Sequence, residues 1–271
     1  MRDIVGLIGF LVLCVVSAPT ASYAQSTNVD LELVLAVDVS GSVDDEEAIL
    51  QRRGYVEAFQ DPMIIDAITR GRYGAIAVTY IEWAGERYQN PIVGWTRISN
   101  AKEAAEFADK LAFEPIAVNV WTSISTIITV GTQLIQQNGY NARRKVIDVS
   151  GDGANNDGEL VNIARDRAIV QGITINGLPI INDRLSRYGR PQIPNLDYYY
   201  TDCVVGGPGA FIIVANGFFD YARAVRQKLI LEIAGLMPEE EKPAPLLQHA
   251  RSDIRPPCIV GESLRQDYDD F

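Results

Sequence analysis

The chain has 271 residues and a formal net charge of −11, from 35 acidic residues against 24 lysines and arginines. This acidic balance argues against binding to nucleic acid or to an anionic membrane surface, because both depend on clustered basic side chains. A metal ion or a basic partner suits the charge better.

The N-terminus has the order of a secretory signal, which is a basic residue, an apolar stretch and a small-residue end. Arg2 precedes the apolar residues 4–16, and Ser22-Tyr23-Ala24 ends the segment, so we expect cleavage after Ala24. The apolar stretch is too short for a membrane anchor, and no later run approaches the roughly 20 apolar residues of a spanning helix. We therefore predict a periplasmic or secreted protein, with a signal peptide (1–24), one domain (25–236) and a tail rich in proline and charge (237–271).

Short β-rich runs alternate with amphipathic segments along the rest of the chain. We expect strands at residues 31–37, 73–83, 145–149, 174–179 and 210–215, with a short run at 91–95 that can pair antiparallel with the strand before it. We expect helices at residues 44–60, 100–112, 123–138, 158–171 and 218–234. This alternation predicts the α/β class, with a doubly wound, mostly parallel sheet, one antiparallel edge strand and helices on both faces.

Two regions have no regular periodicity. Residues 183–203 contain two prolines and three consecutive tyrosines, which predicts an irregular loop. From Pro238 onward proline and charge dominate, which predicts a poorly ordered tail. Cys203 and Cys258 remain after signal cleavage in an oxidising compartment, so we predict a disulfide between them; the alternative is two separate buried thiols.

A carboxylate and two hydroxyls follow the first predicted strand at alternate positions. Asp38, Ser40 and Ser42 place three hard oxygen ligands in one turn, which suits Mg²⁺ or Mn²⁺ better than zinc. The turn also has a simpler interpretation, because Ser42 or Asp44 could cap a helix that opens with acidic residues. The two interpretations are compatible, since open parallel sheets bind ligands where strands turn into helices.

Two later turns can complete this site. Thr122 lies between a strand-like segment, residues 116–121, and a predicted helix, while Asp152 follows the strand at 145–149. The carboxyl ends of neighbouring strands meet at one edge of a doubly wound sheet. We therefore predict a site for Mg²⁺, with Mn²⁺ or Ca²⁺ as alternatives, made by Asp38, Ser40, Ser42, Thr122 and Asp152.

This combination resembles the von Willebrand factor type A domain, whose metal-ion-dependent adhesion site uses Asp-x-Ser-x-Ser, a threonine in a second loop and an aspartate in a third. The resemblance covers residues 31–235, and residues 202–211 also resemble a motif of exported bacterial proteins of unknown function. It implies that a partner protein fills an open metal position with an Asp or Glu carboxylate. The chain departs from the family where glycine stands before Asp152 instead of threonine, and Trp121 stands where glycine is usual.

The leading hypothesis is an exported, metal-dependent protein-binding module without enzymatic activity. The single histidine, His249, lies in the predicted tail, and the sequence motifs of serine hydrolases, NTP-binding proteins and zinc proteases are missing. One alternative is a Mg²⁺-assisted hydrolase in which Asp148 or Glu82 activates water. Asp148 has two interpretations of its own, either supporting the metal ligands or facing a neighbouring helix. Another alternative is a structural protein whose former metal loop only holds the turn.

Overall fold

The computed structural model describes residues 26–115, 119–186, 189–238 and 254–269. Within them a six-stranded sheet has the order β3-β2-β1-β4-β5-β6, and β3 runs antiparallel to β2 while the other neighbours are parallel. This arrangement confirms the predicted fold class and its antiparallel edge strand. The strands are β1 (Thr27–Asp38), β2 (Ile76–Trp83), β3 (Gln89–Ile98), β4 (Tyr140–Gly151), β5 (Thr174–Ile181) and β6 (Ala215–Asn216).

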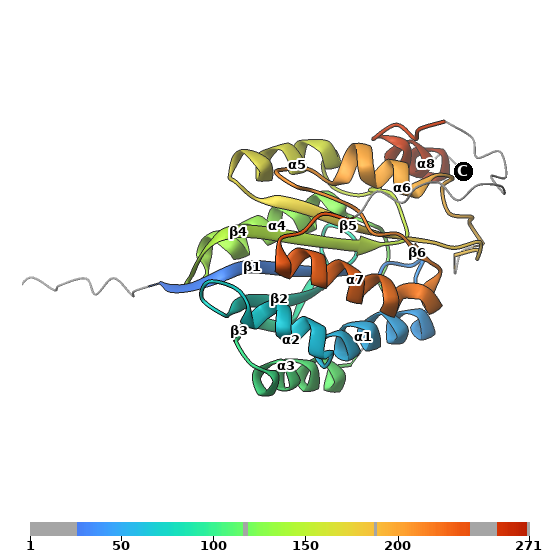
Figure 1. Ribbon diagram of the computed structural model, residues 1–271. Coiled ribbons are helices and arrows are strands. Elements are labelled where there is room, and N and C mark those ends of the chain that lie inside the picture. The colour runs from blue at the N-terminus through green and yellow to red at the C-terminus, as the bar shows by residue number, and fades with distance from the viewer. Residues whose placement is uncertain (1–25, 116–118, 187–188, 239–253, 270–271) are drawn as a thin grey trace, which may run out of the picture.

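Helices cover both faces of the sheet (Figure 1). One face carries α1 (Asp45–Phe59), α2 (Pro62–Thr69), α3 (Ala101–Phe113) and α7 (Tyr221–Ala234). The other carries α4 (Ile124–Gln137), α5 (Val161–Val170) and α6 (Leu196–Tyr199).

Successive residues of the central strand β1 point into opposite cores, Leu33 and Leu35 into one and Val34 and Ala36 into the other. Such a strand is apolar along its whole length, which is why its sequence shows a continuous run instead of an alternation.

Helix α1 begins directly after the predicted metal loop. Asp44 caps it, because its side chain accepts a hydrogen bond from the backbone N–H of Glu47 while the Glu47 carboxylate accepts one from the backbone N–H of Asp44. Of the two residues predicted as the cap, Asp44 fills the position. The Ser42 hydroxyl is therefore left to bond across the site.

Two predicted strands are wrong in extent. The segment predicted at 210–215 joins the sheet only through the short β6 and an isolated bridge between Ile212 and Gly177. Gly207 and Gly209 precede it with positive φ angles of 96° and 70°, so the chain turns there instead of extending. Residues 119–121 have no strand pairing, and the remainder of the strand-like segment, residues 116–118, lies outside the described residues.

The last part of the predicted irregular loop and part of the predicted tail form helices, while the described residues 183–186 and 189–194 have no helix or strand, as predicted. Residues 196–204 form α6 and a π-helical turn that bury Tyr199 and Tyr200 completely. The tail contains helix α8 (Val260–Asp269), and the Cys203–Cys258 disulfide is present with an S–S distance of 2.03 Å. The predicted signal peptide, residues 1–24, and the segment with His249 lie outside the described residues.

Candidate metal centre

The first predicted ligand, Asp38, ends β1 and is completely buried. Its Oδ1 accepts a hydrogen bond of 2.7 Å from the backbone N–H of Ser40, which orients the carboxylate toward the loop. Its Oδ2 is buried and has no hydrogen-bond partner. A buried carboxylate oxygen without a partner is costly, so this atom is a candidate ligand for a cation.

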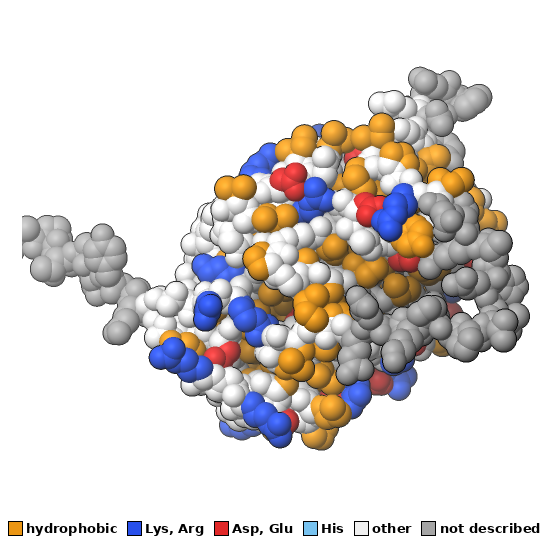
Figure 2. Space-filling model, turned by 45° about the horizontal axis from the view of Figure 1, so that its top comes forward, with side chains coloured by type: hydrophobic (Ala, Val, Ile, Leu, Met, Phe, Trp, Pro, Cys, Tyr) orange, Lys and Arg blue, Asp and Glu red, His pale blue; other side chains and the backbone are white. Residues whose placement is uncertain are grey.

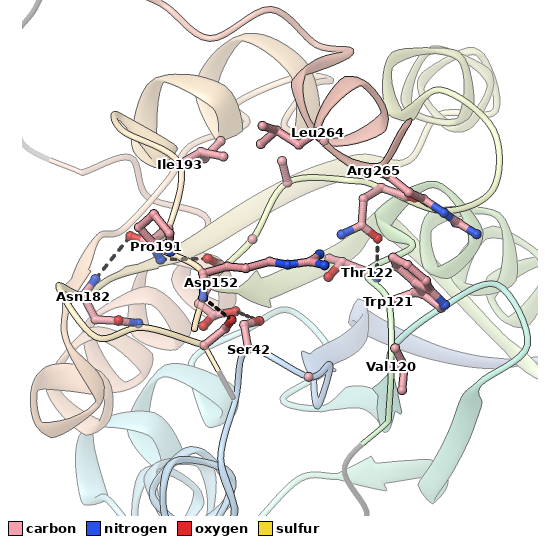
Figure 3. A pocket seen from close by; sticks show the side chains of 18 of the residues that line it. Ser42, Val120, Trp121, Thr122, Asp152, Asn182, Pro191, Ile193, Leu264 and Arg265 are labelled. Carbon is pink, nitrogen blue, oxygen red and sulfur yellow. Dashed lines mark hydrogen bonds between the residues drawn. The ribbon is translucent and has the colours of Figure 1, made fainter. Parts of the chain in front are cut away.

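The structure brings all five predicted side chains together. The Thr122 hydroxyl donates to Ser40 Oγ at 3.2 Å, and the two serine hydroxyls lie 3.2 Å apart. The Ser42 hydroxyl in turn donates to Asp152 Oδ1 at 2.5 Å. Figure 3 shows Ser42, Thr122 and Asp152 around one pocket at the carboxyl edge of the sheet. The convergence agrees with the geometry expected for neighbouring parallel strands.

Both carboxylates of the site are held in an unfavourable electrostatic state. Burial first, and the charge of Asp152 second, raise the pKa of Asp38 well above its usual value. Burial is also the main cause that raises the pKa of Asp152 to about 6, against the lowering effect of the Ser42 hydrogen bond. Nearby positive charge would relieve both groups.

The loop that carries Thr122 is held by contacts with the turn at residues 155–156, and the sequence did not predict these contacts. The backbone N–H of Thr122 donates to Asn156 Oδ1 at 2.8 Å, and the backbone N–H of Asn156 donates to the Thr122 carbonyl at 2.8 Å. Asn155 holds the start of α4 in a similar way, since its Oδ1 accepts a hydrogen bond of 2.9 Å from the backbone N–H of Ser125. The adjacent asparagines were the only local signal for this role, because asparagine side chains commonly bond to nearby backbone.

Two further residues at the site could not be found from the motif. A Cβ on Gly151 would lie 2.8 Å from Asp38 Oδ2 and 2.9 Å from the Tyr200 hydroxyl oxygen, so only glycine fits between them. The buried Tyr200 hydroxyl has no hydrogen-bond partner, and burial followed by the charge of Asp38 raises the pKa of Tyr200 well above its usual value. The glycine before Asp152, a departure from the family pattern, is thus explained by close packing.

Neither acid considered for water activation is placed for that role. Asp148 lies on the strand β4 but binds the Lys228 ammonium of α7 at 2.5 Å, which matches the interpretation that it faces a neighbouring helix. Glu82 forms a buried ion pair with Arg52 of α1. Both carboxylates are therefore engaged with cations of the chain, and the hydrolase alternative loses the residues that motivated it.

The donor set fits a hard divalent cation. Among the described residues no group of three or more His, Cys, Asp or Glu side chains could hold a metal, so a cation here must draw on the hydroxyls as well. Two carboxylates and three hydroxyls are the oxygen ligands that Mg²⁺, Mn²⁺ and Ca²⁺ accept. The unpartnered Asp38 Oδ2 supplies the independent observation that points to such an ion.

The fold is similar to several solved structures at low sequence identity. One is a von Willebrand factor type A protein from Catenulispora acidiphila, at 13% identity and a TM-score of 0.52, covering 76% of this chain and 43% of that chain. Another is proximal thread matrix protein 1 from the mussel byssus with a zinc-occupied MIDAS motif, at 13% identity and a TM-score of 0.54, covering 78% of this chain and 50% of that chain. A third is the pilus adhesin SpaC from Lactobacillus rhamnosus GG, at 13% identity and a TM-score of 0.57, covering 77% of this chain and 31% of that chain.

The chain thus spans half or less of these three proteins, and identities this low show the fold alone, which is of the von Willebrand factor type A kind. The family described as "Protein of unknown function (DUF1194)" matches residues 28–237. The predicted resemblance to that fold and to an uncharacterised subgroup is confirmed. No curated protein matches the sequence. Within the described residues, no helix has the length and apolar character needed to cross a membrane.

Proposed function

We propose, from the premise that this chain belongs to the DUF1194 family and has a von Willebrand factor type A fold, that it is a metal-dependent protein-binding module of the adhesion type. The divalent cation would be held by Asp38, Ser40, Ser42, Thr122 and Asp152. When bound, it would supply a Lewis-acidic position for an Asp or Glu carboxylate of a protein partner. The module would act in the periplasm or outside the cell after removal of residues 1–24.

The observation that carries the proposal is a pair of buried carboxylates without a cation from the protein itself. Within the described residues neither Asp38 nor Asp152 forms an ion pair with lysine or arginine, and Asp38 Oδ2 has no hydrogen-bond partner. Two buried acids with raised pKa values, one of them raised partly by the charge of the other, are a poor choice for a purely structural turn. They are a good choice where a divalent cation completes the charge.

A protein partner fits the surface better than nucleic acid does. In the space-filling view, lysine and arginine side chains are scattered among acidic and apolar ones, with no continuous basic patch on the part of the described surface in view (Figure 2). The named neighbours support the same class, since one is a pilus adhesin and another carries zinc in its MIDAS motif. Zinc therefore belongs among the cations to be tested.

Titration calorimetry of the EDTA-stripped chain from Gln25 onward tests the proposal. We expect saturable one-site binding of Mg²⁺, Mn²⁺, Ca²⁺ or Zn²⁺ that disappears in Asp38→Asn and in Asp152→Asn. Asp66→Asn, which removes an exposed carboxylate from α2, is the control and should bind as the wild type does. A folded wild type that binds none of these cations would contradict metal dependence and leave the structural alternative.

A further inference from the structure

A pocket of about 320 Å³ opens beside the predicted metal ligands Ser42, Thr122 and Asp152 (Figure 3). This volume is at the small end for ligand sites and suits one or two amino-acid side chains better than a folded surface. Three segments far apart in the sequence form its other walls. They contribute Trp121 from the Thr122 loop, Pro191 and Ile193 from the segment after β5, and Leu264 and Arg265 from α8.

The charged groups that line the pocket reverse the balance of the whole chain. Arg184, Arg190 and Arg265 line it against the single carboxylate of Asp152, in a protein with a net charge of −11. Carboxylates behind the wall orient two of these arginines: Asp44 and Glu47 bind Arg184, and Asp157 binds Arg265. A guanidinium has five N–H donors in a fixed plane and can serve more than one carboxylate.

Apolar side chains line the same pocket as these arginines. Leu264 and Ile193 point toward each other across its upper rim, and Trp121 lies beneath Arg265 (Figure 3). The Arg265 guanidinium lies 4.1 Å from the centre of the Trp121 ring, a cation–π contact that fixes both groups. Trp121 itself has a φ angle of 67°, which is unusual for a side chain of this size, so the loop is held in this conformation by its surroundings.

The wall from α8 is a fixed part of the site. The Cys203–Cys258 disulfide lies directly before α8, and a Cβ on Gly261 would collide with the backbone carbonyl of Asn155, so the helix packs closely on the turn. Asn155 Nδ2 donates to Glu262 Oε1 at 2.7 Å, and an Arg265 N–H donates to the Asn156 carbonyl at 3.0 Å. α8 lies beyond residues 28–237, the part of the chain that matches the family.

We propose that this pocket binds an acidic peptide segment of the partner. One carboxylate of the segment goes to the metal loops, a neighbouring apolar side chain packs on Trp121 and Leu264, and a second carboxylate meets the arginines, chiefly Arg265. The first contact rests on the proposed metal-dependent function. The other two depend on the pocket itself and make α8 the element that determines specificity.

Three blocked peptides provide the probes, measured by titration calorimetry with Mg²⁺ and again in EDTA. Gly-Asp-Leu-Glu-Gly carries both acids and the apolar residue, Gly-Asp-Leu-Gln-Gly lacks the second acid, and Gly-Asp-Gly-Glu-Gly lacks the apolar side chain. We expect the first peptide to bind about fivefold more tightly than either of the others, the size of one partly exposed ion pair or one small apolar contact. Its affinity should also fall as salt is raised.

Replacement of Arg265 separates the pocket from the metal loops. Arg265→Gln should weaken binding of the diacidic peptide about fivefold and change binding of Gly-Asp-Leu-Gln-Gly little, while Arg265→Lys should retain part of the difference. Arg226→Gln is the matched control, because Arg226 also joins two elements through an ion pair but lies on α7. If Arg265→Gln disturbs cation binding through Asn156, Arg184→Gln provides the same comparison from the segment after β5.

The outcomes distinguish this inference from the proposed function. Cation binding together with equal affinity for the three peptides, or with no peptide binding, would overturn the pocket and leave the metal centre intact. Peptide binding that requires Arg265 in EDTA as well as in Mg²⁺ would support the pocket and remove the metal dependence.

Discussion

Strand β4 and the turn directly after it each contribute one residue to a group of buried acids, and the two groups have different partners. Asp148, within the strand, and Glu232 of α7 both bind the buried Lys228 ammonium at 2.5 Å, and Asn176 donates to Glu232 at 2.7 Å. Asp152, just after the strand, lies with Asp38 among hydroxyls, and the described chain provides neither with a cation. One acidic group is neutralised within the fold, whereas the other is the group that the proposed function assigns to an external cation.

This difference in partners separates the acids that a lysine of the chain neutralises from the acids that we propose bind a cation. Burial raises the pKa of Asp148 to about 7 and that of Asp152 to about 6, so a raised pKa does not separate the two sites. The partners of the acids do separate the two sites, because a lysine belongs permanently to the chain, whereas a divalent cation can be exchanged.

The largest effect is expected from removal of the internal cation. Lys228→Met leaves Asp148 and Glu232 buried without a counterion and should lower the free energy of unfolding by about 3–5 kcal/mol, as measured by urea denaturation. Arg226→Met, on the same helix but in an exposed pair with Asp61, should cost about 1 kcal/mol or less. Similar losses in the two variants would show that the Lys228 cluster is not a buried ion-pair network.

Removal of the disulfide should act on the metal side of the molecule. The double variant Cys203→Ala, Cys258→Ala opens a link across a sequence separation of 55 and should lower the free energy of unfolding by about 2–4 kcal/mol. Because α8 packs on residues 154–157, amide hydrogen exchange should rise in that turn before it rises in α7. Faster exchange first in α7 would mean that the disulfide supports the Lys228 side instead.

Metal addition should stabilise the fold through one of the two acidic groups only. A cation at 100 times its dissociation constant adds about 2.7 kcal/mol to the free energy of unfolding of any protein that binds it only when folded. We expect this gain in the wild type and in Lys228→Met, and its loss in Asp38→Asn, from paired unfolding curves in Mg²⁺ and EDTA. An equal gain in Asp38→Asn would place the cation elsewhere.

The smallest effect is expected in the pH dependence of stability. The pKa of Asp148 is raised to about 7, first by burial and then by Glu232. A carboxyl whose pKa is higher in the folded chain stabilises the fold while protonated, so this contribution is lost as pH rises from about 4 to 7. Asp148→Asn should flatten that decline in unfolding measurements in EDTA, whereas the exposed Asp166→Asn should leave the slope unchanged.

Much of the scaffold could be predicted because its signals are local. The helix predicted at residues 44–60 is observed as α1 with Asp44 and Gln60 as its caps, since capping and apolar periodicity are encoded within a few residues. α2 was missed although Asp61 caps it and Pro62 occupies its first turn, a signal that was present and overlooked. α8 was missed because proline and charge dominate the tail, and its order comes from packing against a distant turn.

The five predicted metal ligands could be found for a similar reason. Each follows a strand or precedes a helix, and the topology of a parallel sheet brings such positions to one edge. No comparable signal in the sequence identifies Tyr200, Asn156 or Arg265 as part of the site. Tyr200 lies against Gly151 beside Asp38, Asn156 bonds to Thr122, and Arg265 lies over Trp121, and these contacts depend on how separate segments pack.

The sequence by itself determined the alternation of strands and helices, the caps and the convergence of Asp38, Ser40, Ser42, Thr122 and Asp152, because these follow from local patterns and sheet topology. Only the tertiary structure decided which buried acid receives a lysine and which is left with hydroxyls. The Thr122–Ser40 hydrogen bond joins residues 82 positions apart, and the Arg265–Asp157 pair joins residues 108 apart. Contacts at such separations depend on the packing of the whole chain, and so does the balance of charge within each buried site.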